Sequence, residues 1–218
     1  MFAKILRYLF FFFIVKPYIY LGLGVNVSGV ETLNKIAKGP SIIVANHNSH
    51  VDTLLLLSLF NCSQILKIHP VAAADYFCNT KLKAFIFKTL LGIIPFSRKV
   101  RKASEEELFK DINTALRSGE SIIIYPEGTR GEDNTIKKFK SGVAHIAKMN
   151  PEIPVVPVYI NGPDRILPKG ALLWVPFIAD VYVSEPVYYD GTSTKDFTER
   201  IKADVEKLKE EHKRREEL

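Results

Sequence analysis

The chain has 218 residues, of which 47% are hydrophobic, contains only two cysteines and carries a net charge of +6. This length suits one domain with a full core, and the composition excludes disordered, collagen-like and disulfide-stapled chains. Because there are only two cysteines, we expect a reducing compartment. The charge is uneven, because residues 1–30 and 76–104 together carry ten basic and no acidic residues, and such zones suit phosphate groups on a nucleic acid, a membrane or a soluble ligand.

The first 25 residues are the most apolar part of the chain, and five of its 14 phenylalanines lie within the first 13. The uncharged run Tyr8–Val15 is shorter than the roughly 20 apolar residues that cross a bilayer, and Lys16 follows it. We expect residues 1–25 to form a membrane-associated helical segment that lies in one leaflet, with Lys4, Arg7 and Lys16 reaching the headgroups. The alternatives are a buried amino-terminal helix and a signal peptide, although no small-x-small cleavage site follows the apolar run.

Beyond Glu31, short apolar runs alternate with helical patterns. The runs predict extended segments at 41–45, 92–96, 121–125, 153–160 and 177–189. The helical patterns cover 51–60, 104–119, 142–149 and a last helix from about residue 195. Neither a repeat nor a linker interrupts this alternation, so residues 26–218 are expected to form one α/β domain.

His47 and Asp52 lie between the first of these strands and the helix that follows it. On one continuous helix their side chains would diverge by about 140°. With His47 in the loop and Asp52 at the start of the helix, the carboxylate can fold back onto the imidazole, fix its tautomer and support a general base. The alternative is that Ser49 or Asp52 only caps the helix. A metal site built on His47 and His50 lacks a third ligand at suitable spacing, so no metal is expected.

A run of three isoleucines leads into a second polar cluster, Tyr125–Gly131. The glycines that flank Thr129 and Arg130 let the backbone approach a ligand closely, and the guanidinium can bind a phosphate through two hydrogen bonds. The alternative is a Pro-Glu-Gly turn with a solvated arginine. Arg98, which follows the segment 92–96, opens a basic run that otherwise indicates a solvated loop.

These clusters occur in a recognisable order: Asn46-His47 with Asp52, Gly92–Phe96 with Arg98, Tyr125–Arg130, and Val156-Pro157-Val158. Over roughly residues 30–190, the sequence resembles the glycerolipid acyltransferase family, in particular the 1-acylglycerol-3-phosphate acyltransferases. The resemblance implies a single domain with a central mixed sheet flanked by helices. It also implies transfer of a fatty acyl group from acyl-CoA or acyl carrier protein to the free hydroxyl of 1-acylglycerol-3-phosphate, which gives phosphatidic acid and needs no cofactor.

Carried over residue by residue, the resemblance makes His47 the general base and Asp52 the acid that orients it. The acceptor-binding residues that it implies are Arg98, Glu127, Gly128, Thr129 and Arg130. Lys140 could add charge at the acceptor phosphate, or it is a surface lysine. The sequence has no Gly-x-Ser-x-Gly elbow, so we expect direct transfer without an acyl-enzyme.

The acceptor and the donor stay open at this point. Another lysolipid, such as lysophosphatidylethanolamine or a lyso-aminolipid, is the nearest alternative acceptor, and a non-catalytic lipid-binding protein is the alternative from another class. No nucleic-acid partner is expected, because no nucleic-acid module accompanies the basic zones. The expected partners are a lysophospholipid, the thioester donor and a membrane surface, with the chain on the cytoplasmic face of the cell's inner membrane. The basic residues between 81 and 102 could face headgroups or the donor's phosphates.

Overall fold

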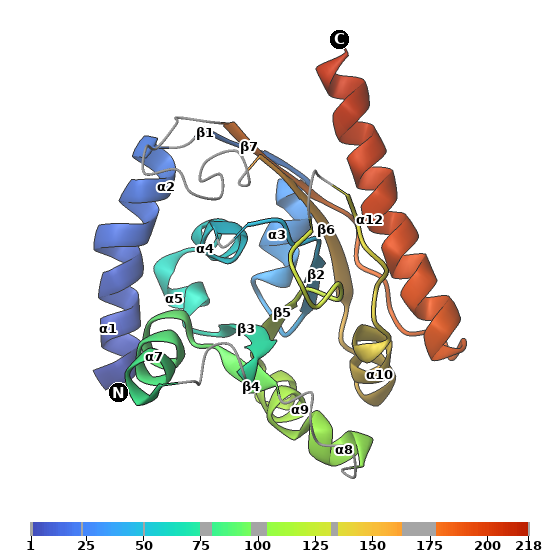
Figure 1. Ribbon diagram of the computed structural model, residues 1–218, viewed down its shortest axis with the longest axis horizontal. Helices are drawn as coiled ribbons and strands as arrows, with labels where there is room; N and C mark the ends of the chain where they lie inside the picture. Colours follow the sequence, from blue (N-terminus) through green and yellow to red (C-terminus); the bar gives the residue numbers. More distant parts are fainter. Residues whose placement is uncertain are drawn as a thin grey trace.

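The computed structural model describes residues 2–22, 24–49, 51–74, 80–96, 104–131, 135–162 and 178–217. Within them, a seven-stranded sheet lies between two layers of helices (Figure 1). The strands are β1 (Gly24–Ser28), β2 (Ile42–Ala45), β3 (Ile68–Ala73), β4 (Ile94–Phe96), β5 (Ser121–Ile124), β6 (Val155–Asn161) and β7 (Ile178–Val183). Their order across the sheet is β1-β7-β6-β2-β5-β3-β4, and neighbours are parallel except for β6 and β7. The predicted α/β domain with a central mixed sheet is confirmed.

Helices cover both faces of this sheet. On the first face lie α1 (Phe2–Phe10), η1 (Phe11–Val15), α2 (Lys16–Gly22), α3 (Val30–Ile36), α4 (Val51–Ser58) and α5 (Cys62–Ile65). On the second face lie α9 (Lys110–Arg117), α10 (Gly142–Met149) and α12 (Thr194–Glu216). The remaining helical elements are α7 (Lys81–Ile86), η2 (Phe87–Leu91) and α8 (Glu105–Leu108). The strands alternate between the two cores, so that Ile43 and Ala45 of β2 face one layer while Ile42 and Val44 face the other.

The parallel centre of the sheet decides where loops meet. Strands β2, β5 and β3 are adjacent and parallel, and β2 is completely buried. Parallel strands end at the same edge of a sheet, so the loops that follow β2 and β5 come together there. His47 and the cluster Tyr125–Gly131 lie in these loops, and Asp52 lies at the start of the helix that follows the first of them.

Some elements differ from their predicted form. The helix predicted over 104–119 is divided into α8 and α9 at Phe109, whose φ of −102° and ψ of 10° are not helical. Its predicted apolar face is nevertheless buried through Phe109, Ile112 and Leu116. Strands β1 and β3 and helix α3 have no counterpart among the predicted elements, whereas α10 has the predicted bounds.

The amino-terminal segment is one helix from Phe2 to Gly22, because α1, η1 and α2 follow each other without a break. By length and hydropathy alone, these 21 residues would reach across a bilayer, although the apolar run in the sequence is shorter. The helix continues through Pro17 because a π-helical turn, η1, precedes the proline. Such a wider turn accommodates a ring that would clash with the carbonyl four residues earlier in a regular α-helix.

This helix has two different faces. Arg7, Phe11, Val15 and Ile19 recur every fourth residue, and all four are buried against the domain. The prediction that Arg7 reaches the lipid headgroups is therefore wrong: it lies on the buried stripe, is 4% exposed, and its Nη2 donates a hydrogen bond of 2.7 Å to the carbonyl of Ile68. The other face is exposed and apolar, and its members are Phe2, Ile5, Leu9, Phe12, Phe13, Ile14 and Leu21.

Candidate active site

The structure brings His47 and Asp52 together at the carboxyl end of β2. His47 lies in the loop after the strand, Asp52 is the second residue of α4, and Nδ1 of the histidine is 3.0 Å from Oδ2 of the aspartate. A carboxylate oxygen only accepts hydrogen bonds, so Nδ1 carries the proton and Nε2 keeps its lone pair. The His47 side chain is 21% exposed. This is the tautomer that a general base needs.

Asp52 is held by more than the imidazole. Its side chain is 1% exposed, and Oδ2 also accepts the backbone N–H groups of Asn48 and Ser49, each at 2.8 Å. The carboxylate lies in the first turn of α4, where the helix dipole stabilises negative charge. Asp52 therefore orients His47 and closes the loop before the helix at the same time, so the two interpretations of the sequence are compatible. Its Oδ1 is buried and has no hydrogen-bond partner among the described residues.

Asn46 holds the beginning of the His47 loop, directly after β2, against the neighbouring strand. It is 1% exposed, its side-chain Nδ2 donates to the carbonyl of Ile160 at 2.9 Å, and its Oδ1 accepts the N–H of the same residue at 2.7 Å. The amide thus continues the parallel pairing of β2 with β6 one step beyond Ala45 and Val158. The Val156-Pro157-Val158 block of the sequence belongs to this partner strand.

Glu127 links the loop after β5 to the loop that carries His47. Its Oε1 accepts the backbone N–H of His47 at 2.9 Å, and its Oε2 accepts that of Lys137 at 3.1 Å. In return, Gly131 donates its N–H to the carbonyl of His47 at 2.7 Å. Burial raises the pKa of Glu127, and these two backbone hydrogen bonds act in the opposite direction. Both carboxylate oxygens thus accept hydrogen bonds from backbone amides. Through Oε1, a residue of the loop after β5 holds the backbone of His47 in place.

Tyr125 supports the imidazole from one side, a contact that the sequence reasoning missed. Its ring stacks on the His47 ring at a centroid distance of 4.2 Å and an angle of 21°. Its hydroxyl lies 3.0 Å from that of Thr53 on α4. Burial raises the pKa of Tyr125, and the negative charge of Asp52 adds to the effect. The available sequence signal was the position of Tyr125 at the end of the strand beside β2.

The other predicted residues of this loop are open to solvent. Thr129 and Arg130 are exposed, and so is Lys140. Gly128 has a φ of +71°, and a Cβ at this position would lie 2.6 Å from Nζ of Lys140. The lysine head therefore lies directly against the turn because residue 128 lacks a side chain.

Two predicted positions, Arg98 and His50, lie outside the described residues. Among the residues that are described, no three His, Cys, Asp or Glu side chains are grouped to hold a metal ion.

A hollow of about 340 Å³ opens beside the site. It lies at the carboxyl ends of β3 and β5, and its walls are largely apolar side chains such as Val71, Phe96 and Ile112. Tyr125, Gly128 and Lys140 form its polar margin. An apolar hollow with a few polar groups at one end is the usual form of a small-molecule site.

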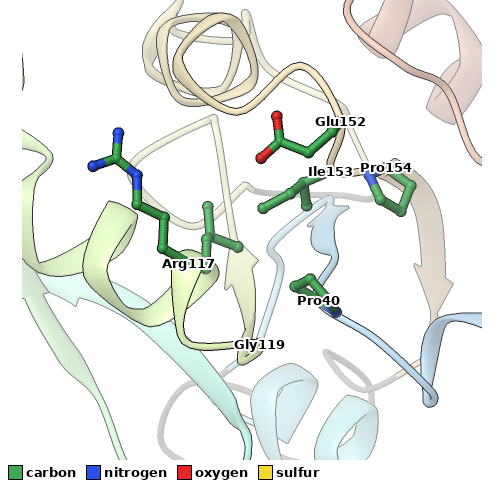
Figure 2. Close-up of a pocket in the computed structure, with 7 residues that line it drawn as sticks. Pro40, Arg117, Gly119, Glu152, Ile153 and Pro154 are labelled. Atoms are coloured by element: carbon green, nitrogen blue, oxygen red, sulfur yellow. The ribbon is translucent and has the colours of Figure 1, made fainter.

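A second hollow of about 390 Å³ lies at the opposite edge of the sheet, where β2, β5 and β6 begin (Figure 2). Its lining includes the charged residues Arg117 and Glu152 and the prolines Pro40 and Pro154. This second hollow and His47 lie at opposite ends of the strands. Residues around the hollow are therefore suitable for control substitutions that should not affect the candidate site.

Comparison with known proteins relates these observations to a family. The family described as Acyltransferase matches residues 24–161 of this chain. The 1-acyl-sn-glycerol-3-phosphate acyltransferase LPAT1 of Arabidopsis thaliana is 27% identical over 159 residues, which are 70% of this chain and 40% of that protein. The 1-acyl-sn-glycerol-3-phosphate acyltransferase of Saccharomyces cerevisiae is 29% identical over 161 residues, 72% of this chain and 48% of that protein. The chain spans less than half the length of these two relatives.

A solved structure has the same architecture. The crystal structure of PlsC, the 1-acyl-sn-glycerophosphate acyltransferase from Thermotoga maritima, matches with a TM-score of 0.70 over 96% of each chain, at 24% sequence identity. The two chains therefore share a fold.

Proposed function

This chain belongs to the acyltransferase family, and from that premise we propose that it acylates 1-acylglycerol-3-phosphate to phosphatidic acid. The acyl donor is a thioester, either acyl-CoA or acyl carrier protein, and no cofactor takes part. The contact of 3.0 Å between Nδ1 of His47 and Oδ2 of Asp52 carries the proposal, because it leaves Nε2 as a base at the carboxyl edge of the sheet. The matching relatives are named for this activity.

The reaction is proposed to pass directly from donor to acceptor. Nε2 of His47 takes the proton of the acceptor hydroxyl while its oxygen attacks the thioester carbonyl carbon. The new C–O bond forms, the C–S bond breaks, and the leaving thiolate receives the proton from the imidazolium. Asp52 stabilises the imidazolium that exists between these two transfers. General-base assistance of this kind contributes about 10²–10⁴-fold to a rate.

The acceptor is proposed to bind over the loop after β5. Arg130 is exposed and can bind a phosphate monoester through two hydrogen bonds, with Lys140 and the Gly128 turn beside it. Thr129 and Arg98 complete the proposed acceptor set. Glu127 has both oxygens on backbone amides, so we assign it the task of holding the two loops at a fixed separation. The apolar hollow next to Tyr125 then suits hydrocarbon from one of the substrates.

Acceptor preference tests this assignment. We expect purified protein in detergent to use lysophosphatidic acid at least tenfold better, in kcat/KM, than lysophosphatidylethanolamine. Replacing Arg130 by glutamine should raise the KM for lysophosphatidic acid about tenfold with little change in kcat, because a phosphate contact made equally in ground and transition states affects binding alone. A matrix of acyl-CoA and acyl carrier protein against both acceptors measures all of these values and identifies the donor.

Arg117→Gln is the matched control for Arg130→Gln, because Arg117 is exposed at the opposite edge of the sheet. It should leave both KM values unchanged. Equal use of the two acceptors would indicate a different lysolipid as the substrate. Binding of lipid vesicles without consumption of any thioester would instead indicate a lipid-binding protein.

We propose that residues 1–25 hold the acyltransferase domain, residues 26–218, on the cytoplasmic face of the membrane, where the thioester is delivered. The buried stripe extends from Arg7 to Ile19 and docks the helix along its length on the domain, which supports a helix lying in one leaflet and not crossing. Its exposed apolar face is then turned to lipid. Because α2 packs against α4, the helix that carries Asp52 lies directly behind the membrane-facing element.

The exposed phenylalanines of this helix should decide membrane binding. Phe12 and Phe13 are 50% and 66% exposed, and burial of their exposed parts in lipid is worth roughly 2–3.5 kcal/mol. The double variant Phe12→Ser/Phe13→Ser should therefore bind anionic vesicles at least about 20-fold more weakly in a sedimentation assay, while its activity in detergent is retained. Tyr188→Ser removes an aromatic ring of 53% exposure elsewhere and should bind vesicles like the wild type. Unchanged vesicle binding of the double variant would contradict the proposed orientation.

A further inference from the structure

Arg7 is a charged residue in a place where the amino-terminal helix otherwise presents apolar side chains. It is the first member of the buried stripe that continues with Phe11, Val15 and Ile19. Lys4, one turn earlier on the same helix, is exposed. Burial lowers the pKa of Arg7 to about 10, with Glu120 acting in the opposite direction, so the side chain is cationic at neutral pH. A cation is costly to bury unless its surroundings are built for it.

The surroundings of Arg7 are built around Gly92. This glycine ends η2 with a φ of +66°, and a Cβ at this position would lie 2.1 Å from Nη1 and 2.6 Å from Cζ of Arg7. The guanidinium therefore occupies the space that a side chain at position 92 would need. On its other side, Nη2 donates to the carbonyl of Ile68 at 2.7 Å. Arg7 thus connects the turn at Gly92 with the beginning of β3.

A second contact holds the same turn from the sheet. Nδ1 of His69 lies 2.8 Å from the carbonyl oxygen of Gly92, and because a carbonyl only accepts, Nδ1 carries the proton and donates. Nε2 of the same ring lies 3.0 Å from Oε2 of Glu120, just before β5. Arg7 of α1 and His69 of β3 therefore converge on one glycine, and Glu120 contacts the far side of the histidine ring.

The turn at Gly92 begins the segment that leads to the proposed acceptor site. From there the chain enters β4, which pairs in parallel with β3 from Val71↔Ile94 to Ala73↔Phe96. At its far end, Phe96 lines the apolar hollow beside Tyr125 and Gly128, and Arg98 follows two residues later in the sequence. The near end of this segment is thus held by Arg7, and the far end borders the site.

We propose that Arg7 is a positioning residue for the acyl acceptor, which acts by seating the segment Gly92–Phe96 against β3. The inference rests on the proposed function. It makes the amino-terminal helix part of the acceptor site's framework as well as a membrane contact. Displacement of the guanidinium shifts the start of β4 and moves Phe96, which lines the hollow together with Gly128 and Lys140 of the proposed acceptor site. The His47 loop after β2 keeps its own supports from Asp52 and Glu127.

The test compares Arg7→Met, Arg7→Lys and the control Lys4→Met as full-length proteins in detergent micelles, where membrane docking does not affect the rate. We expect Arg7→Met to raise the KM for lysophosphatidic acid about tenfold, with the KM for the thioester changed by less than about twofold. Arg7→Lys keeps the cation and should raise the acceptor KM by only about threefold. Lys4→Met should match the wild type. Hydrogen exchange should be faster at the amides of Ile93, Ile94 and Phe96 in the two Arg7 variants and unchanged in β2.

The outcomes separate the possible explanations. If Arg7 only stabilises the fold, its variants lose active protein, so the apparent kcat falls while both KM values stay at the wild-type level, and that result overturns the proposal. If Arg7→Met gives no soluble protein, the two KM values of Arg7→Lys decide by the same criterion. A wild-type protein that does not acylate lysophosphatidic acid contradicts the proposed function itself, whereas an active wild type with an unchanged acceptor KM in the Arg7 variants contradicts this inference alone.

Discussion

Replacement of His47 by glutamine is expected to lower kcat for phosphatidic acid formation by about 10³-fold, within the range that a general base contributes. Glutamine is close to histidine in size and can donate a hydrogen bond to Asp52, but it offers no nitrogen lone pair to accept the hydroxyl proton. Both kcat and kcat/KM should fall by the same factor, because proton transfer takes place only in the transition state. Thioester consumption by purified protein in detergent measures the effect.

His145→Gln provides the matched control. His145 on α10 forms a comparable pair, with Nδ1 2.9 Å from Oε2 of Glu105, yet it belongs to the opposite layer of helices. This variant should retain the wild-type rate to within about twofold. A His47→Gln protein that is folded and keeps more than a tenth of the wild-type rate would show that the hydroxyl loses its proton in another way.

Replacement of Asp52 by asparagine should lower kcat by about 10²–10³-fold, and the structure makes this substitution unusually informative. Oδ2 accepts all three hydrogen bonds of the carboxylate, whereas Oδ1 has no partner among the described residues. Asparagine can therefore place its oxygen where Oδ2 lies and keep every contact to His47, Asn48 and Ser49. It loses the negative charge that stabilises the imidazolium. Its NH₂ group also takes the buried place of Oδ1 without a hydrogen-bond partner, which destabilises the folded variant.

Asp52→Ala separates charge from geometry, because alanine also releases the imidazole and the two backbone amides. We expect its rate to be equal to that of Asp52→Asn or lower, with a lower midpoint of thermal unfolding. The control is Asp190→Asn, which alters an aspartate that likewise accepts several hydrogen bonds, from Thr192 and Arg200, far from the site. If Asp52→Asn kept nearly full activity, Asp52 would be a loop and helix-start residue without an electrostatic part in the reaction.

The sequence was sufficient to predict the local parts of this structure. Apolar runs and helical spacing located β2, β5 and α10 to within a residue or two, because each is specified by its own side chains. The contact between His47 and Asp52 was also accessible, since both belong to one strand-loop-helix unit only five residues apart. The division of the helix at Phe109 was not, because the apolar periodicity continues across it.

Local sequence patterns do not predict contacts between distant parts of the chain. Asn46 is 114 residues from the backbone group that it pairs with, and Glu127 is 80 residues from the amide of His47. Arg7 had the appearance of an interfacial cation, because neither a buried carbonyl at Ile68 nor a missing side chain at Gly92 can be associated with it before the fold is known. In each case a hydrogen-bond partner is a backbone group, which any residue type can supply.

The order of the strands also sets the scale of the site. The proposed base, His47, lies just after β2 and the proposed phosphate-binding loop follows β5. These strands are direct neighbours, separated by the roughly 4.8 Å of a hydrogen-bonded pair. That interval is a property of the peptide backbone, so no exchange of side chains can lengthen it. Under the proposed function, the sheet fixes the separation of the two loop origins from which the acceptor's anionic group and its reacting hydroxyl are held. Under the same proposal, a change of acceptor requires changes in the loops after β2 and β5 and not in the spacing of the strands that carry them.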